Sequence, residues 1–289
     1  MTTELLPAQS AGTFALGGDL TINRLGYGTM QLTGDGVWGP PDDQDGAIAV
    51  LKRAIELGVN FFDTADSYGP AVAEPLIAKA LKPYPDDLVI ATKAGLTRSG
   101  PNVWPPVGRP EYLRQQTEMS LRWLGVERID LMQLHRVDEK VPLEDQVGEF
   151  KKLQDEGKIR HIGLSEVSVD QLKQAQKVAE IVSVQNLYNL TNRSSEELVD
   201  YATEQGIAFI PWFPLATGGL TGADSPLTEL AEKKNATPAQ LALAWLLKRS
   251  PVMLPIPGTK SVAHLEDNLL GAGIELSDAE FDELSNIQK

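Results

Sequence analysis

The sequence predicts an α/β fold: a closed (β/α)8 barrel of the TIM type with an N-terminal β-hairpin plug. Short apolar runs, typical of buried strands, alternate with amphipathic helical segments along the chain. No composition break or linker interrupts the alternation, so residues 1–289 are predicted to form a single domain. The alternative is an open doubly wound sheet. Against it, Gly26 and Gly28 lack the third glycine and the helix start of a dinucleotide-binding fingerprint.

Eight apolar runs are predicted as strands, and seven segments with helical periodicity lie between or after them. The strands are residues 20–25, 59–63, 88–93, 129–134, 159–164, 181–185, 208–212 and 252–256. The helices are residues 44–57, 73–81, 110–124, 143–156, 169–179, 195–205 and 238–248. Residues 13–22 are predicted as a hairpin that turns at Gly17-Gly18 and plugs the bottom of the barrel. Residues 277–280 form a capping box that opens a terminal helix.

Composition excludes several classes of protein. The formal charge of −14 argues against nucleic acid and anionic membranes as partners, because both require a basic surface. The chain has no cysteine, so disulfides, thiolate zinc sites and cysteine nucleophiles are excluded. No secretory signal is visible, and no apolar run approaches the roughly 20 residues that span a bilayer. A cytoplasmic, soluble protein is expected.

Polar or aromatic side chains follow most of the predicted strands at their C-terminal ends. In a parallel barrel these ends share one face, which carries the active site in TIM-barrel enzymes. The residues found there are, in order, Gly28, Thr29 and Met30; Asp63 and Tyr68; Lys93; His135; Ser165 and Glu166; Gln185; Trp212 and Phe213; and residues 257–260. An inert barrel would need only loop residues at these positions, so the pattern indicates a functional site.

The chain resembles the aldo-keto reductases over nearly its whole length. The supporting segments are residues 24–30 (RLGYGTM), 62–69 (FDTADSYG), 91–93 (ATK), 129–135 (IDLMQLH), 162–165 (IGLS) and 255–259 (PIPGT). Each is short, but their order and spacing are specific. The resemblance implies a catalytic tetrad at Asp63, Tyr68, Lys93 and His135, and a nicotinamide cofactor bound without a Rossmann domain.

Carbonyl reduction accounts for these four residue types. Hydride transfer develops negative charge on the carbonyl oxygen, which needs a proton or a donor nearby. A free phenol, with a pKa of about 10, is a poor acid at neutral pH. Lys93 is therefore expected to lower the pKa of Tyr68, the acid, while Asp63 keeps the lysine charged and His135 orients the substrate. Taken singly, Asp63 could be a turn former and Tyr68 a rim residue.

Several further positions match the family's cofactor contacts. Ser165 and Gln185 stand where the family hydrogen-bonds the nicotinamide carboxamide, although Ser165 could instead cap a helix. Trp212 stands where an aromatic ring stacks on the nicotinamide, with a buried core tryptophan as the alternative. Glu166 replaces the family's usual Asn, and a carboxylate accepts hydrogen bonds but does not donate them. The other implied cofactor residues here are Gly28, Thr29, Met30, Asp63, Phe213, Pro214 and Leu215.

Residues 257–268 look like the family's site for the adenosine 2′-phosphate. Gly258, Thr259 and Lys260 precede a predicted helix N-terminus, a combination that suits an anion. His264 stands where many relatives carry Arg, and Lys260 can supply the charge. NADPH is therefore the predicted cofactor, with NADH as the alternative. Asp267 and Asn268 fit adenine contacts, although Asn268 could equally be a helix-face residue.

The substrate is predicted to be a small carbonyl compound held by Trp38, Trp104, Tyr68 and His135. Both tryptophans lie in loops rich in Gly and Pro, where an indole either faces the ligand or is pinned against the barrel. Such a mouth favours aromatic aldehydes. Residues 36–41, 184–189 and 212–215 also look similar to the pyridoxal reductase branch of the bacterial members, which implies pyridoxal as a substrate.

Two other functions remain open from the sequence. Potassium-channel β-subunits resemble this pattern and keep a tetrad, so a nicotinamide-binding regulatory subunit with little turnover is the alternative. A metal-dependent barrel hydrolase using Asp63 and His135 is disfavoured by the presence of only three histidines, and no metal is expected. A monomer is expected by analogy with the family.

Overall fold

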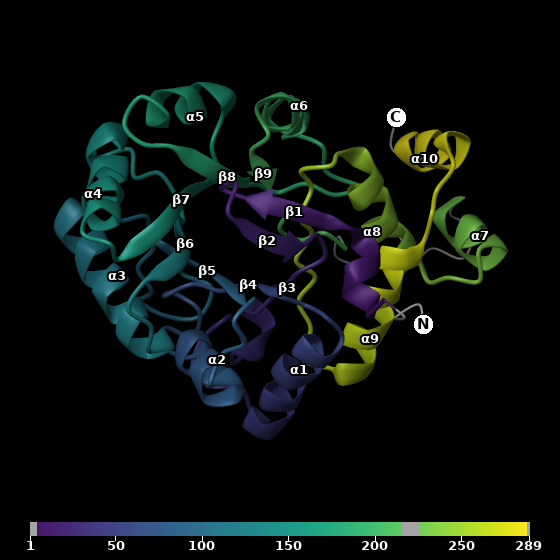
Figure 1. The fold of residues 1–289 in the computed structure, drawn as a ribbon, viewed down its shortest axis with the longest axis horizontal. Helices are drawn as coiled ribbons and strands as arrows, with labels where there is room; N and C mark the ends of the chain where they lie inside the picture. The colour runs from purple at the N-terminus through teal and green to yellow at the C-terminus, as the bar shows by residue number, and fades with distance from the viewer. Residues whose placement is uncertain (1–4, 216–225, 288–289) are drawn as a thin grey trace.

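The computed structural model describes residues 5–215 and 226–287 and has the predicted α/β barrel architecture. Within those residues, seven parallel strands hydrogen-bond in chain order and curl into a barrel wall, with the α-helices outside (Figure 1). The strands are β3 (Tyr27–Gly28), β4 (Phe61–Asp63), β5 (Val89–Ala94), β6 (Ile129–Leu134), β7 (Ile159–Ser165), β8 (Ile181–Gln185) and β9 (Ala208–Phe209). Strand order that follows chain order is what repeated β-α-β units with neighbouring strands produce.

The predicted strand 252–256 is not a regular strand, but it completes the ring. The amide of Phe209 donates to Val252 O at 2.9 Å, and that of Leu254 donates to Phe209 O at 2.8 Å. On the other side, Gly26 N donates to Pro255 O at 2.9 Å. Prolines within and beside this segment lack the N–H groups that a full ladder requires. The segment therefore bridges β9 and the residues before β3 with isolated hydrogen bonds.

The N-terminal hairpin is present, and it corrects one predicted strand. β1 (Thr13–Leu16) and β2 (Leu20–Asn23) pair antiparallel across one end of the barrel (Figure 1). The apolar run 20–25 was predicted as a barrel strand, but it forms the second hairpin strand, and the barrel begins at β3. Asp19 in the turn explains the docking, because it pairs with Arg160 and His161 of β7. Leu16 and Ile22 are completely buried and join the apolar interior of the barrel.

Ten α-helices occupy the described part of the chain. They are α1 (Gln44–Glu56), α2 (Ala73–Leu81), α3 (Pro110–Leu124), α4 (Leu143–Asp155), α5 (Val169–Ala175), α6 (Glu196–Gln205), α7 (Pro226–Lys233), α8 (Pro238–Arg249), α9 (Val262–Leu270) and α10 (Asp278–Ser285). Short 3-10 turns lie at η1 (Pro7–Ala11), η2 (Met30–Leu32) and η3 (Gly271–Gly273). The capping box predicted at Ser277 forms and opens α10. None of the described helices is long and apolar enough to cross a membrane.

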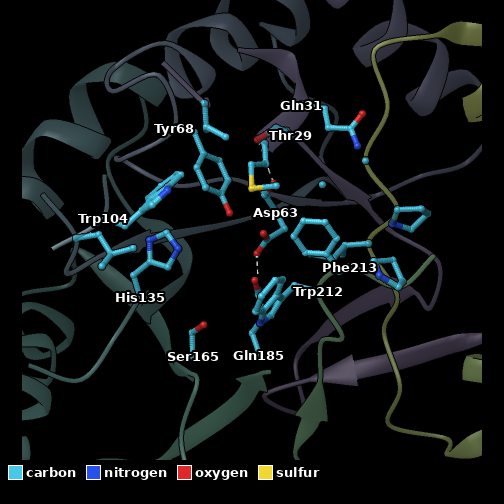
Figure 2. A pocket seen from close by; sticks show the side chains of 18 of the residues that line it. Thr29, Gln31, Asp63, Tyr68, Trp104, His135, Ser165, Gln185, Trp212 and Phe213 are labelled. Carbon is cyan, nitrogen blue, oxygen red and sulfur yellow. Dashed lines mark hydrogen bonds between the residues drawn. The ribbon is translucent and has the colours of Figure 1, made fainter. Parts of the chain in front are cut away.

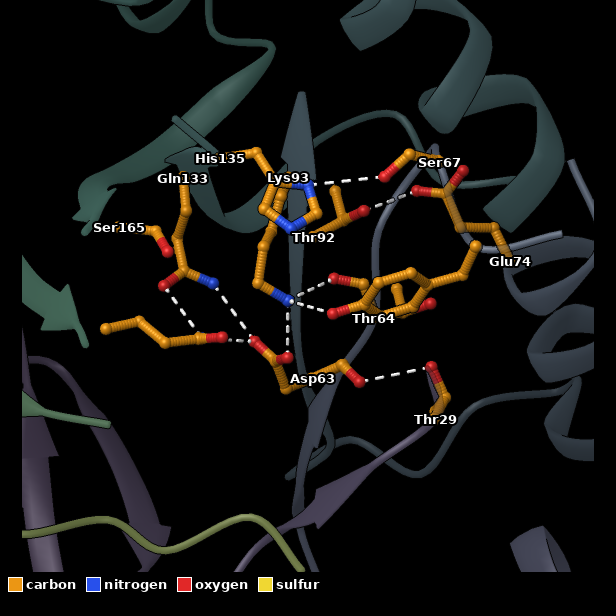
Figure 3. Close-up of polar contacts among 12 residues, drawn as sticks. Thr29, Asp63, Thr64, Ser67, Glu74, Thr92, Lys93, Gln133, His135 and Ser165 are labelled. Carbon is orange, nitrogen blue, oxygen red and sulfur yellow. Dashed lines mark hydrogen bonds and ion pairs between the residues drawn. The ribbon is translucent and has the colours of Figure 1, made fainter. Parts of the chain in front are cut away.

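A buried carboxylate on α2 lies behind the barrel wall. Glu74 is fully enclosed and accepts a hydrogen bond at 2.5 Å from Thr92, whose neighbour in β5 is Lys93 (Figure 3). Its second oxygen has no partner among the described residues. Burial raises the pKa of Glu74 to about 7, because the enclosed site disfavours the charged form.

The pKa of Glu74 predicts how stability depends on pH. The folded protein holds this proton between about pH 4.5 and 7, whereas the unfolded chain releases it, so the contribution of Glu74 is present below pH 4.5 and is lost as pH rises to about 7. The shift corresponds to about 3 kcal/mol. We expect Glu74→Gln to unfold like the wild type at pH 5 and to be the more stable protein at pH 8. Urea titrations at both values measure this. Exposed Glu283→Gln is the control, and an unchanged pH dependence in Glu74→Gln would refute the assignment.

Candidate active site

The C-terminal strand ends open into a cavity of about 550 Å³ (Figure 2). Its wall combines apolar and aromatic side chains with a few polar groups, as small-molecule sites do. Most of the predicted site residues line it, namely Gly28, Thr29, Met30, Asp63, Tyr68, Trp104, His135, Ser165, Gln185, Trp212, Phe213, Pro214, Leu215 and Gly258. Side chains from separate barrel strands and loops thus converge on one site, as the reading of the strand ends predicted.

An ion pair between Asp63 and Lys93 lies at the floor of the site. Asp63 ends β4 and Lys93 lies near the end of the neighbouring strand β5, and both side chains are almost wholly buried. Lys93 Nζ donates to Asp63 Oδ1 at 2.5 Å and to the backbone oxygen of Thr64 at 2.8 Å (Figure 3). Burial alone would lower the pKa of Lys93, but the facing carboxylate more than offsets this and raises it. The ammonium is therefore charged at neutral pH.

Two buried amides complete the surroundings of Asp63. Gln133 Nε2 donates to Asp63 Oδ2 at 3.1 Å, and Gln185 Nε2 donates to the same oxygen at 2.9 Å. Gln185 also donates to Gln133 Oε1 at 3.2 Å. Gln133 was not among the predicted site residues, although a polar side chain inside an otherwise apolar strand was the signal for it. The carboxylate thus has partners from β5, β6 and β8.

Tyr68 stands over the lysine. Lys93 Nζ donates to Tyr68 Oη at 3.2 Å, and the ring is buried except for a small part. The sequence predicted that Lys93 lowers the pKa of Tyr68, and the ammonium does act in that direction. Burial of the phenol raises the same pKa by a larger amount. The net pKa lies above the ordinary value, so the phenol is protonated at neutral pH. A protonated phenol beside a charged ammonium can release a proton and leave a stabilised phenolate.

His135 follows β6 and faces the same cavity. Its Nδ1 lies 3.2 Å from Ser67 Oγ, and its ring packs edge-on against Tyr68 with the centroids 5.9 Å apart. Burial, followed by the positive charges of Lys93, Arg136 and Arg98, holds the pKa of His135 well below its ordinary value. The imidazole is therefore neutral at physiological pH and can donate one N–H to a ligand.

Glu166 anchors one aromatic wall of the cavity. Its Oε1 accepts from the indole Nε1 of Trp212 at 2.6 Å and from the amide of Leu187 at 2.7 Å. Its backbone is left-handed (φ 55°), which is unusual for a residue other than glycine. The side chain is not part of the cavity wall. The residue that departs from the family pattern thus fixes the ring of Trp212.

Ser165 and Gln185, predicted as partners of a carboxamide, line the same cavity as this ring. Both are buried and line the cavity (Figure 2). Ser165 Oγ accepts from Arg136 Nη1 at 2.9 Å, which leaves its own hydrogen free to donate. A partly exposed indole, a free hydroxyl and a cavity of this volume fit a nicotinamide ring. This group would bring a hydride donor to the site.

Two glycines allow the close backbone approach that shapes the next part of the cavity. A Cβ on Gly28 would lie 2.8 Å from Ile256 O, and one on Gly258 would lie 2.7 Å from Gly28 O. Any side chain would force the two segments apart. Tyr27 Oη donates to Thr259 O at 2.5 Å and ties the segment to β3. The predicted anion-binding segment is thereby held at the cavity's edge.

The remaining predicted cofactor residues lie outside the cavity wall. Lys260 and His264 are exposed at the start of α9, whose cap is Ser261. Asp267 accepts from Thr237 Oγ1 and Gln240 Nε2, so its carboxylate also braces the start of α8. Asn268 is buried on α9. No cluster of three or more side chains suited to a metal occurs among the described residues.

The two loop tryptophans differ in position. Trp104 lines the cavity, with its ring centroid 6.4 Å from that of Tyr68 and 6.5 Å from that of His135. Trp38 does not line it and is about one third exposed, while its neighbour Val37 is part of the wall. Arg136 also lines the cavity and was missed, although it directly follows His135 at a strand end.

Comparison with known proteins agrees with this geometry. The model of the aldo/keto reductase family matches residues 24–289. The chain belongs to the aldo/keto reductase family. It is 53% identical over 277 residues to an uncharacterised oxidoreductase of Schizosaccharomyces pombe, covering 96% of this chain and 90% of the relative. It is 44% identical over 287 residues to pyridoxine 4-dehydrogenase of Escherichia coli, covering 97% and 99%.

Solved structures carry the same fold. An aldo/keto reductase from Klebsiella pneumoniae in complex with NADP and acetate superposes with a TM-score of 0.80 at 26% identity, covering 95% of this chain and 94% of that one. As an aldo/keto reductase, this protein is an NAD(P)H-dependent oxidoreductase. Its cofactor is a nicotinamide nucleotide, and the reactions of the family involve small carbonyl compounds.

The contact between Glu166 and Trp212 predicts an effect on cofactor binding. Glu166→Gly suits the left-handed backbone but removes the acceptor, so the indole loses its fixed orientation. We expect NADPH to bind roughly 3- to 10-fold more weakly, because only part of the free energy of the lost hydrogen bond, about 1 kcal/mol, is transmitted to the cofactor through the ring. Glu166→Gln keeps an acceptor oxygen with the same reach and should bind within about twofold of wild type. Calorimetric titration measures all three proteins. Wild-type affinity in Glu166→Gly would contradict the anchoring role.

Proposed function

We propose that the protein reduces aldehyde and ketone carbonyls to alcohols with NADPH, acts on aromatic aldehydes including pyridoxal, and uses Tyr68 as its general acid. The supporting observation is the contact of one buried ammonium, Lys93, with both Asp63 and Tyr68 at the cavity floor. A buried lysine beside a phenol favours the phenolate that remains after proton release. The arrangement suits a reaction in which an oxygen in the cavity gains a proton.

The roles of the four residues follow from their contacts. A nicotinamide cofactor bound beside Trp212, Ser165 and Gln185 would supply the hydride for the carbonyl carbon. Tyr68 transfers its proton to the carbonyl oxygen as negative charge develops there, and Lys93 stabilises the resulting phenolate. Asp63 keeps Lys93 charged and placed between Thr64 O and Tyr68 Oη. Neutral His135 donates an N–H to the same carbonyl oxygen and orients it.

The shape and chemistry of the cavity support an aromatic substrate. Trp104, Tyr68 and His135 meet edge-on and present flat, largely apolar surfaces around the catalytic groups. A planar ring stacks well on such surfaces, whereas a sugar would leave its hydroxyls without partners. The relative from Escherichia coli is named for an oxidation at pyridoxine, the alcohol that corresponds to pyridoxal. These observations motivate pyridoxal as the first substrate to test.

NADPH is preferred to NADH in this proposal because of the start of α9. Lys260 is exposed directly before the N-cap Ser261, so a cation and a helix N-terminus can both face a phosphate. His264 lies in the first turn of the same helix. The related Klebsiella pneumoniae structure is a complex with NADP.

Replacing the proposed acid tests the mechanism. Tyr68→Phe removes one oxygen and keeps the ring in place, so proton donation is lost while NADPH binding stays. We expect kcat for an aromatic aldehyde to fall roughly 100-fold or more, because general acid catalysis contributes on that scale. NADPH oxidation is followed by its absorbance with benzaldehyde and with pyridoxal. Full turnover in the variant, or none in the wild type with any carbonyl compound, would refute the proposal.

Cofactor preference is tested at Lys260. Lys260→Ala removes the proposed phosphate partner, so the Kd for NADPH should rise roughly 10-fold, which is typical of one charge-assisted contact. Binding of NADH, which lacks the 2′-phosphate, should change less than about twofold. Exposed Lys177→Ala, outside the cavity, is the control for a lost surface charge. Equal weakening for both cofactors would exclude Lys260 as the phosphate contact.

A further inference from the structure

Arg98 contacts two segments of the cavity mouth, a mouth turn at Gly36–Val37 and a mouth loop at residues 100–106. A guanidinium carries five N–H groups, and here each of the five hydrogen bonds formed goes to a backbone carbonyl. The acceptors are Val103 O at 2.9 Å, Val37 O at 2.8 Å, Ser67 O at 2.8 Å, Gly36 O at 2.9 Å and Gly100 O at 3.4 Å. One side chain thus joins both segments to the residue before Tyr68.

The same guanidinium supports the aromatic rings of the mouth. Its Cζ lies 3.5 Å from the ring centre of Trp104 and 5.7 Å from that of Trp38. A cation at the shorter distance is in direct contact with the ring face. Trp104 in turn meets Tyr68 and His135 edge-on. Arg98 is therefore separated from Tyr68 and His135 by only one ring, that of Trp104.

Arg98 donates hydrogen bonds to backbone segments whose conformation is strained. Val37 and Asn102 adopt left-handed conformations with φ of 55° and 56°. For a β-branched residue such as Val37 this conformation is strained, and it persists only where the surroundings enforce it. Hydrogen bonds from Arg98 to Val37 O and to the carbonyl of its neighbour Gly36 supply that constraint. Val37 and Asn102 both line the cavity.

Arg98 has no carboxylate partner within the described part of the chain. The ion pairs there involve other residues, so all of its contacts are with backbone oxygens and aromatic faces. A salt bridge to a carboxylate would require only a positive charge, which lysine could supply equally well. This arginine is instead used for its planar shape and its number of donors, which lysine does not share.

We propose that Arg98 is a positioning residue that sets the shape of the substrate mouth and thereby selects flat aromatic aldehydes over small aliphatic ones. The proposal rests on the carbonyl reduction proposed above. Arg98 acts through Trp104 and Val37. It contacts neither the hydroxyl of Tyr68 nor Trp212, the residue proposed to stack on the cofactor. Its loss should therefore affect substrate affinity more than turnover or cofactor binding.

The test is Arg98→Lys, which keeps the charge but has three donors and no planar face. We expect KM for benzaldehyde to rise roughly 10-fold, because Trp104 and Val37 would shift and pack less closely against a flat ring. KM for propanal should change less than about twofold, since a small aliphatic chain makes little use of Trp104. The fall in kcat should be smaller than the rise in KM for benzaldehyde, and NADPH affinity should stay the same.

Arg109→Lys is the matched control. Arg109 lies in the same region of the chain, is largely exposed and contacts only Glu111 at 3.6 Å among the ion pairs. It should leave both KM values unchanged. Thermal unfolding checks that Arg98→Lys is folded. A wild-type ratio of the two KM values in folded Arg98→Lys would overturn the proposal.

Hydrogen exchange separates this proposal from the proposed function. In Arg98→Lys, peptides that cover residues 34–41 and 97–107 should exchange faster, because Gly39 N donates to Gly69 O and Asn102 N donates to Gly36 O in the held conformation. If the wild type reduces no carbonyl compound, the proposed function fails and the exchange experiment still decides the role of Arg98. Unchanged exchange in these peptides would show that Arg98 does not hold the mouth.

Discussion

The buried pair of Asp63 and Lys93 is the interaction on which the rest of the site depends. Each charge alone would be strongly disfavoured in this position, because burial removes its hydration. The pair persists because Thr64, Gln133 and Gln185 supply the hydrogen bonds that water would otherwise make. The pair and these partners come from four barrel strands or their ends, so the ion pair requires the strand register of the barrel. A shift of one strand would leave a charge without its partner.

This buried charge sets the protonation states around it. Burial raises the pKa of Tyr68, and the charge of Lys93 lowers it. Burial lowers the pKa of His135, and the charge of Lys93 lowers it further. The result is a protonated phenol and a neutral imidazole, two hydrogen-bond donors that face one cavity. Arg98 and Arg136 lower the pKa of His135 further. In a chain of formal charge −14, the active site is thus a local region of positive charge, which suits an oxygen that becomes negative.

The sequence predicts the chemistry at strand ends better than the contacts between loops. Asp63, Lys93 and His135 could be placed because each ends an apolar run, and the ends of parallel strands share one face. The run 20–25 misled because a hairpin strand and a barrel strand have the same apolar pattern. The net pKa of Tyr68 depends on burial, which no local pattern contains. Arg98 could not be found at all, because its acceptors lie in three segments, residues 36–37, residue 67 and residues 100–103, that only the folded chain brings together.

The cavity is bounded by two indoles, and each is held by a charged residue that lies outside the cavity wall. Glu166 fixes Trp212 through the indole N–H, whereas Arg98 supports Trp104 through the ring face. Neither charged residue lines the cavity, so each can change without placing a new group against the ligand. Because the two contacts share no atoms, we expect the cofactor contact proposed for Trp212 and the substrate contact proposed for Trp104 to be separable by mutation.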